Sequence, residues 1–168
     1  VKRYDAEVAK DGGGRESLRV VLIADLHLGY SVGAKRIEDM VEKVNAQNAD
    51  IVLIAGDIFD NTVDGIDDPE SVKASLRSMK SRLGVYACWG NHDIDELILA
   101  GFTFDSGSDT IRSDPRMDQF LEDSGITLLQ DETLLIDHSF YLIGRLDASC
   151  KKKSGIIRRS AKELPAAL

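Results

Sequence analysis

Cysteine and histidine are scarce in this chain, which limits the metal and disulfide sites that it can build. Its two cysteines, Cys88 and Cys150, have a spacing that fits neither a zinc knuckle nor a disulfide framework. Cys88 lies inside an apolar run and is expected to be a small buried residue. Only three histidines are present, at positions 27, 92 and 138, so few imidazole ligands are available to any one site.

Long apolar runs and an excess of positive charge are also missing. No stretch approaches about 18 consecutive apolar residues and nothing resembles a signal peptide, so the chain as given is expected to be soluble. It begins with Val1 rather than Met, which leaves a processed leader, a membrane anchor or an artificial boundary open as explanations.

The 29 acidic and 21 basic residues give a net charge of −8, and such a surface repels a phosphate polymer on average. Nucleic acid is therefore not an expected partner. The basic run from Lys151 to Lys153 is interpreted as a solvated loop rather than as a contact for anionic lipid.

The hydrophobic periodicity predicts alternating strands and helices in one domain over residues 1–168. Strands are expected over 20–24, 51–55, 85–89, 126–129, 133–136 and 140–143, and helices over 34–48, 69–81 and 115–124, with another helix beginning near Ser160. The alternation of Tyr4, Ala6 and Val8 predicts a half-exposed strand, and the glycines at 12–14 predict a turn. Residues 101–114 are expected to form a loop, either a lid or an inert surface excursion. The predicted fold class is α/β, with a mixed, mainly parallel sheet flanked by helices.

Polar side chains of the kind that bind metals directly follow three of the predicted strands. The runs are Asp25-Leu-His27, Gly56-Asp57-Ile-Phe-Asp60 and Gly90-Asn91-His92-Asp93. Successive runs are separated by a little over 30 residues, which is about the length of one strand–helix–strand repeat. If the strands are parallel neighbours, their carboxyl ends lie at one edge of the sheet, where open α/β folds hold ligands. The three runs are therefore expected to converge.

The residue types in these runs predict a site for two divalent cations. Asp25 and His27 leave a strand end on the same side, and a carboxylate with an imidazole suits zinc, iron or manganese. Each oxygen of Asp57 can take one ion, which would hold two metals about 3.5–4 Å apart. Asn91 offers a neutral amide oxygen to the second ion. The predicted metal ligands are thus Asp25, His27, Asp57 and Asn91.

A two-metal site of this kind predicts hydrolysis of a phosphoester. Water between the two ions loses a proton near neutrality, with a pKa that falls to about 7, and becomes a bridging hydroxide nucleophile. His92 is predicted to protonate the leaving alkoxide, with Asp93 or Asp60 orienting its ring. Taken alone, each of the first two runs would more often be a solvated turn, and the third could as readily cap the helix that follows it. Their common register favours the metal site.

The same three runs resemble the first signature blocks of the calcineurin-like metallophosphoesterase superfamily. The resemblance spans about residues 18–93, and it implies two bound metals, a proton-donating histidine at His92 and one half of a four-layer sandwich. The segment Gly144-Arg145-Leu-Asp147 is faintly similar to a bacterial, often membrane-anchored branch. The implied substrate is a phosphorylated small molecule or a lipid-linked phosphate, with membrane proximity supplied by a segment preceding Val1.

The chain departs from that family in one respect. The family completes its site with a later histidine and a Gly-His-x-His block, whereas the remaining histidine here, His138, is expected to be a structural residue at a turn. We therefore expect the domain to be incomplete at its C-terminus. The alternative hypothesis is a catalytically incomplete module that keeps the fold and serves as an interaction platform.

Overall fold

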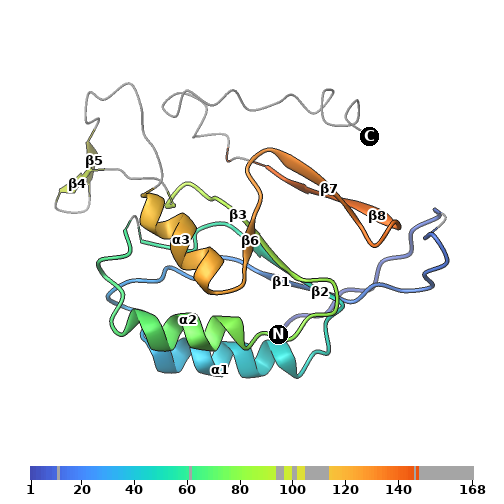
Figure 1. Cartoon of the computed structure of the whole chain (residues 1–168), viewed down its shortest axis with the longest axis horizontal. Coiled ribbons are helices and arrows are strands. Elements are labelled where there is room, and N and C mark those ends of the chain that lie inside the picture. The colour runs from blue at the N-terminus through green and yellow to red at the C-terminus, as the bar shows by residue number, and fades with distance from the viewer. Residues whose placement is uncertain are drawn as a thin grey trace.

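Four parallel strands form the central sheet of the computed structural model shown in Figure 1. The structure describes residues 1–10, 12–60, 62–93, 97–99, 102–104, 114–145 and 147. The strands are β1 (Val20–Ile23), β2 (Ile51–Ala55), β3 (Val85–Cys88) and β6 (Thr127–Leu128), in the order β1-β2-β3-β6. Because all three pairings are parallel, every strand of this sheet ends at the same edge.

Three helices connect these strands and contribute their apolar faces to the core. They are α1 (Ala34–Asn45), α2 (Pro69–Arg77) and α3 (Pro115–Asp123). In Figure 1, α1 and α2 lie side by side below the sheet, and α3 lies next to α2. The apolar residues of α1 recur at helical spacing, so Ile37, Val41 and Val44 share one buried face. Covering one face of the sheet with such helices makes the domain α/β, as predicted.

The helix boundaries follow local sequence signals. α2 begins after Asp68, whose side chain accepts a hydrogen bond from the backbone N–H of Ser71 at 3.2 Å, and Pro69 occupies its first turn. α1 ends at Asn45, three residues before the predicted stop, and Asn48 then takes a left-handed backbone conformation. The helices predicted over 34–48, 69–81 and 115–124 are therefore confirmed, and two of them, α1 and α2, end some residues earlier than expected.

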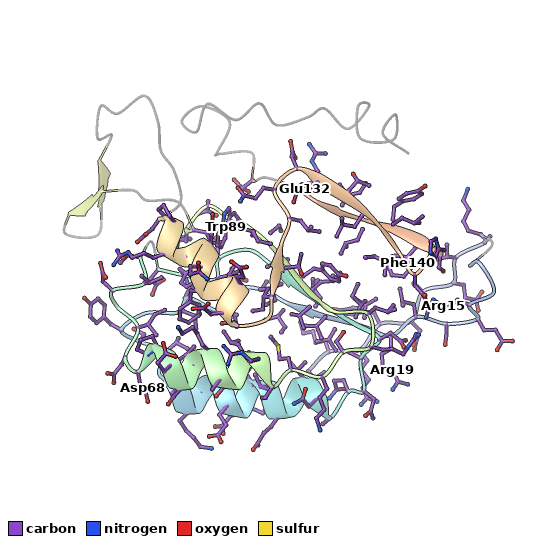
Figure 2. The ribbon with its side chains drawn as sticks, in the orientation of Figure 1. Arg15, Arg19, Asp68, Trp89, Glu132 and Phe140 are labelled. Carbon is purple, nitrogen blue, oxygen red and sulfur yellow. The ribbon has the colours of Figure 1, made fainter. Side chains whose placement is uncertain are left out.

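Aromatic residues fill the core between the sheet and α3. Phe59 is fully buried, and its ring packs edge-on against Trp89 at 6.0 Å and Phe120 at 5.5 Å between centroids. Figure 2 shows Trp89 beside α3. Phe59 and Trp89 belong to the segments that leave β2 and β3, so this packing also anchors the two segments that carry the candidate site. Cys88 is half-buried rather than fully buried, and this burial raises the pKa of its thiol.

Two antiparallel pairs stand apart from the parallel sheet. The strands β7 (Glu132–Ile136) and β8 (Phe140–Gly144) form a hairpin, and β4 (Leu97–Leu99) pairs with β5 (Phe102–Phe104). The predicted strands after residue 126 are thus confirmed, although β7 and β8 form their own sheet. β5 lies within residues 101–114, where the sequence predicted only a loop. The rest of that loop, the run from Lys151 to Lys153 and the helix predicted near Ser160 lie outside the described residues, apart from Asp114, which caps α3.

The strand predicted from Tyr4 to Val8 is wrong. Residues 1–9 have no strand conformation and the side chain of Tyr4 is exposed, because this segment pairs with none of the described strands. The glycine turn that follows is confirmed, with Gly13 and Gly14 at positive φ. It docks on the β7–β8 hairpin, where Ser139 Oγ donates to the carbonyl of Gly12 at 2.6 Å.

The N-terminal segment makes an ion pair with the same hairpin turn. Arg15 pairs with Asp137, and Figure 2 shows Arg15 beside the hairpin end that carries Phe140. The turn spans residues 137–139 and places Asp137 and His138 at φ values of 49° and 51°, in the left-handed region, while the N–H of Ser139 donates to the carbonyl of Ile136 at 2.9 Å. His138 therefore lies in the turn, as the sequence predicted.

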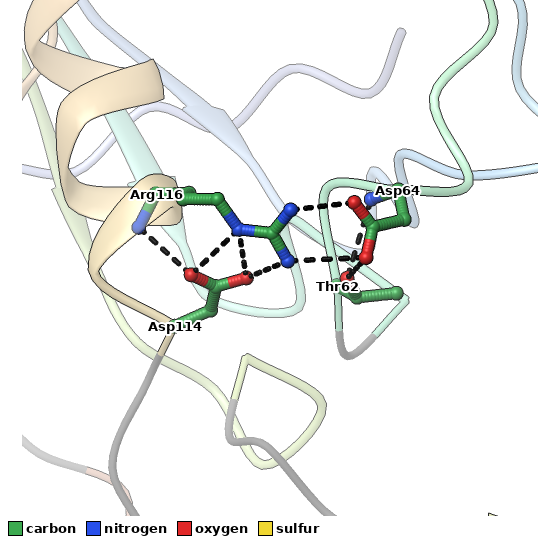
Figure 3. A network of polar contacts seen from close by, with 4 residues as sticks. All are labelled: Thr62, Asp64, Asp114 and Arg116. Carbon is green, nitrogen blue, oxygen red and sulfur yellow. Dashed lines mark hydrogen bonds and ion pairs between the residues drawn. The ribbon is translucent and has the colours of Figure 1, made fainter.

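A polar network joins the start of α3 to the loop after β2. Arg116 Nη1 lies 2.6 Å from Asp64 Oδ1, and Arg116 Nη2 lies 2.6 Å from Asp114 Oδ2 (Figure 3). Thr62 Oγ1 adds a hydrogen bond to Asp64 at 3.2 Å. The arginine holds the pKa of both carboxyl groups below the ordinary value.

Candidate metal site

The segments that follow β1 and β2 remain paired beyond the ends of the two strands. The backbone N–H of His27 donates to the carbonyl of Asp57 at 3.0 Å, and that of Leu28 donates to the carbonyl of Ile58 at 2.7 Å. The N–H of Asp25 bonds to Gly56 in the same direction, at 3.3 Å. This extended pairing holds the first two sequence runs in a fixed register at the carboxyl edge of the sheet.

Two glycines allow the third run to approach the second. Gly56 has φ +81°, and a Cβ atom there would lie 2.7 Å from Gly90 Cα. A Cβ atom on Gly90 would lie 2.5 Å from the backbone nitrogen of Asp57. Both distances are shorter than real Cβ contacts, so only glycine fits at either position. The close approach lets the N–H of His92 donate to Asp57 Oδ1 at 3.0 Å.

Three of the four predicted metal ligands come together at this edge. Asp25, His27 and Asp57 each offer one ligand atom, and these atoms all lie within 4.8 Å of one another. Asp25 is exposed, while His27 and Asp57 are partly buried, so the cluster is open to solvent on one side. Two carboxylates and an imidazole at this separation fit a borderline divalent cation. Asn91 lies between Gly90 and His92, which both contact Asp57, and its ligand role stays a prediction.

The same three residues have strained backbone conformations. Asp25, His27 and Asp57 have φ values of 55°, 48° and 51°, in the left-handed region that L residues with a Cβ atom rarely adopt. Each such residue costs on the order of 1–2 kcal/mol, which surrounding contacts must offset. Strain gathered at three neighbouring polar residues is typical of a functional site. A β-strand alternation does not predict these conformations, so the sequence could not reveal them.

His92, the predicted proton donor, lies next to the cluster. Its ring centroid is 5.1 Å from that of His27, at an interplanar angle of 72°. The hydrogen bond from its backbone to Asp57 fixes the segment that carries the ring. The structure therefore brings the predicted acid beside the predicted ligands.

Asp93 is fully buried and accepts three backbone hydrogen bonds. Its Oδ1 atom accepts from the N–H groups of Ile58 and Phe59, and its Oδ2 atom accepts from that of Gly90, each at 2.8 Å. Burial raises the pKa of Asp93, and the three amide donors oppose that rise. The carboxylate thus ties the segment after β2 to the segment after β3.

The contacts of Asp93 and Asp60 differ from the sequence expectation that one of them orients His92. Both oxygens of Asp93 face backbone amides, and Asp60 Oδ1 lies 2.8 Å from Nδ1 of His27. The reason is geometric: the left-handed residues at the ends of β1 and β2 turn the side chains in directions that residue spacing does not encode. The Asp60–His27 pair was accordingly missed.

The structure thus defines an α/β domain with carboxylates and an imidazole gathered at the carboxyl edge of its parallel sheet, where open α/β folds hold ligands. The sequence profile of the calcineurin-like phosphoesterase family matches residues 18–147. The chain therefore belongs to this family, whose members are metal-dependent phosphoester hydrolases.

Several curated proteins are similar to part of the chain. A transmembrane protein with a metallophosphoesterase domain from Danio rerio is 43% identical over 76 residues, which are 45% of this chain and 17% of that protein. A UDP-2,3-diacylglucosamine pyrophosphatase from Chlamydia trachomatis is 32% identical over 93 residues, 55% of this chain and 28% of the relative. An uncharacterized metallophosphoesterase from Campylobacter jejuni is 29% identical over 96 residues, 55% of this chain and 23% of the relative. The matched region spans less than a third of each of these relatives.

Membrane association was left open by the sequence. Among the helices in the described part of the chain, none has the length and apolar character that crossing a membrane requires.

Proposed function

We propose that the chain carries the metal site of a phosphoester hydrolase that uses two divalent cations, manganese, zinc or iron. The observation that carries the proposal is the convergence of Asp25, His27 and Asp57, whose ligand atoms lie within 4.8 Å of one another. Asn91 would serve as the fourth ligand, because it lies between Gly90 and His92, which both approach Asp57. Family membership supports the same assignment.

The charges of these residues suit a phosphate substrate. Asp25 and Asp57 contribute −2, whereas His27 and Asn91 are neutral, so two bound divalent ions would leave the site positively charged in a chain of net charge −8. When bound, the ions supply a hydroxide nucleophile and neutralise the phosphoryl oxygens. Asp57 is suited to bridge the two ions. Its Oδ1 atom already accepts the backbone N–H of His92, which fixes the direction of the carboxylate.

His92 is proposed to donate the proton to the leaving alkoxide. Its ring lies 5.1 Å from that of His27, so it stands beside the ligand cluster without belonging to it. Asp93 acts on the reaction as a positioning residue, because its three backbone hydrogen bonds hold the segment that carries Asn91 and His92.

The proposed substrate class is a phosphorylated small molecule or a lipid-linked phosphate. One relative is named as a UDP-2,3-diacylglucosamine pyrophosphatase, and others as transmembrane proteins. These names support a phosphate substrate that carries an apolar group, handled next to a membrane. The negative charge of the chain also disfavours a polymeric phosphate.

The test is an assay of aryl phosphate and aryl phosphodiester hydrolysis with added Mn²⁺. We expect His92→Ala to lower turnover by about 10²–10⁴-fold with metal content kept, and Asp57→Asn to lower the metal content itself. His138→Ala is the matched control, because this histidine lies in the β7–β8 turn. Equal turnover in wild type and His92→Ala would remove His92 from the acid role. Two bound metals without turnover would instead support the interaction platform.

A further inference from the structure

We propose that Asp60 is a positioning residue that fixes the ring of His27, so that Nε2 of the ring faces the cation. The inference rests on the proposed function only in that it takes His27 to be a metal ligand. It concerns a residue that is not one of the three whose ligand atoms lie together, Asp25, His27 and Asp57.

The contact itself determines the tautomer of His27. Asp60 Oδ1 lies 2.8 Å from His27 Nδ1. An ionised carboxylate can only accept, so Nδ1 must carry the hydrogen of this bond. A neutral imidazole has a single N–H, and the lone pair therefore remains on Nε2. Asp60 thus selects the form of His27 that would bind a cation through Nε2, and the contact at Nδ1 fixes the orientation of the ring.

Backbone contacts hold Asp60 in place on the side away from the ring. Its N–H donates to the carbonyl of Leu28 at 3.1 Å, and the N–H of Leu28 donates to the carbonyl of Ile58 at 2.7 Å. The segments after β1 and β2 are therefore bonded to each other on both sides of the pair. These hydrogen bonds fix the distance between the two backbone segments that carry His27 and Asp60.

Gly29 closes the space on the other side of the carboxylate. A Cβ atom at this position would lie 3.0 Å from Asp60 Oδ2 and 3.2 Å from Asp60 Cβ. A larger residue at position 29 would have to push Asp60 from its place. The glycine two residues after the ligand His27 is thus part of the same arrangement.

Exposure indicates that the pair serves orientation rather than stability. The side chains of His27 and Asp60 are 36% and 44% exposed, and partly exposed ion pairs contribute little to folding. Mutation of a carboxylate that accepts a hydrogen bond from the second nitrogen of a ligating histidine typically lowers metal affinity by about 10–100-fold. With this exposure, we expect an effect near the lower end of that range.

The experiment compares Asp60→Ala, Asp60→Asn and Asp64→Ala in the whole chain. Long-range ¹H–¹⁵N spectra of the metal-free protein at about pH 8 report the tautomer of His27, and titration with Mn²⁺ and Zn²⁺ reports affinity. Asp60→Asn keeps an oxygen that can accept from Nδ1 while it removes the charge. Asp64→Ala removes one negative charge from the same loop, at a side chain that pairs with Arg116 instead.

We expect Asp60→Ala to lose the Nδ1–H tautomer and about 10-fold in metal affinity, and Asp60→Asn to keep the tautomer with a smaller loss. Asp64→Ala should leave both close to wild type. An unchanged Nδ1–H signal in Asp60→Ala would overturn the inference. Equal losses of metal affinity in Asp60→Ala and Asp60→Asn would also overturn it, because they would indicate an effect of charge alone. Failure of the wild type to bind either metal would refute the proposed function, and the tautomer of the metal-free protein would still decide the role of Asp60.

Discussion

Replacing Asp93 by asparagine tests whether a buried carboxylate assembles the site from two separate segments. Three backbone amides point at its oxygens, two at Oδ1 and one at Oδ2, each at 2.8 Å. An asparagine side chain has the same shape but only one accepting oxygen. If that oxygen keeps the amides of Ile58 and Phe59, the side-chain NH₂ group faces the N–H of Gly90, and two donors oppose each other.

The expected loss follows from that count. A hydrogen bond to a charged group contributes about 1.5–3 kcal/mol, and an amide donor left without a partner in the interior costs about 1–3 kcal/mol. Burial raises the pKa of Asp93, so removing the charge also removes a desolvation cost and offsets part of the loss. We expect Asp93→Asn to lower the free energy of unfolding by about 1–3 kcal/mol.

The assay is urea unfolding together with the metal content of the folded protein. Asp118→Asn is the control, because Asp118 is an exposed carboxylate on α3. The variant at Asp93 should lose both stability and metal affinity, since Gly90 and the residues after it are no longer held against the segment after β2. A loss no larger than that of Asp118→Asn would refute the reasoning.

Three further predictions test other parts of the structure. Gly90→Ala should lower the free energy of unfolding by about 1–3 kcal/mol and abolish metal binding, because its Cβ atom would lie 2.5 Å from the backbone nitrogen of Asp57. In the same unfolding assay the control Gly33→Ala, whose Cβ atom would lie in open space, should lower the free energy of unfolding by only a few tenths of a kcal/mol. His138→Gly should raise the free energy of unfolding by about 1 kcal/mol, because φ is 51° at this position and glycine adopts positive φ without the steric cost of a Cβ atom. His138→Ala should not raise it, and equal free energies of unfolding for the two variants would contradict the left-handed conformation of the turn. Arg116→Gln should lower the melting temperature at pH 7, because the arginine lowers the pKa of its two carboxylate partners, Asp64 and Asp114. Their stabilisation is complete above the ordinary value of 3.8 and is lost as the pH falls through the lowered pKa values, so the difference from wild type should vanish well below 3.8. A difference that persists at low pH would assign the effect to packing.

The convergence of the site could be predicted from the sequence because it depends on strand order and strand ends. Buried apolar runs of the right length, separated by helical patterns, require parallel neighbours, and parallel neighbours end at one edge. The position of Asp25, His27 and Asp57 follows from this argument without knowledge of side-chain directions. The helices were predictable for the same reason, since their apolar periodicity is local.

Side-chain partners within the site could not be predicted in this way. Asp60 and Asp93 have the same offset from the ends of their strands, because β2 ends at Ala55 and β3 at Cys88. The spacing therefore gives no reason for one to face His27 and the other to face three backbone amides. Those directions depend on left-handed residues at positions 25, 27 and 57, which are not glycines. The strand expected around Tyr4 failed for a related reason: alternation describes one segment, whereas a strand needs a neighbour.

The backbone strain at this edge of the sheet is offset by the contacts that hold the three segments together. Three left-handed residues cost on the order of 1–2 kcal/mol each, and the carboxylates of Asp25 and Asp57 repel each other when no cation lies between them. The contacts that offset these costs lie just outside the cluster: the paired backbone after β1 and β2, the close approach of Gly56 and Gly90, and the buried carboxylate of Asp93. These contacts would hold the ligands together before a metal arrives, so a bound cation would relieve repulsion without having to organise the site. Metal affinity should therefore depend as strongly on Asp93 and the two glycines as on the ligands themselves.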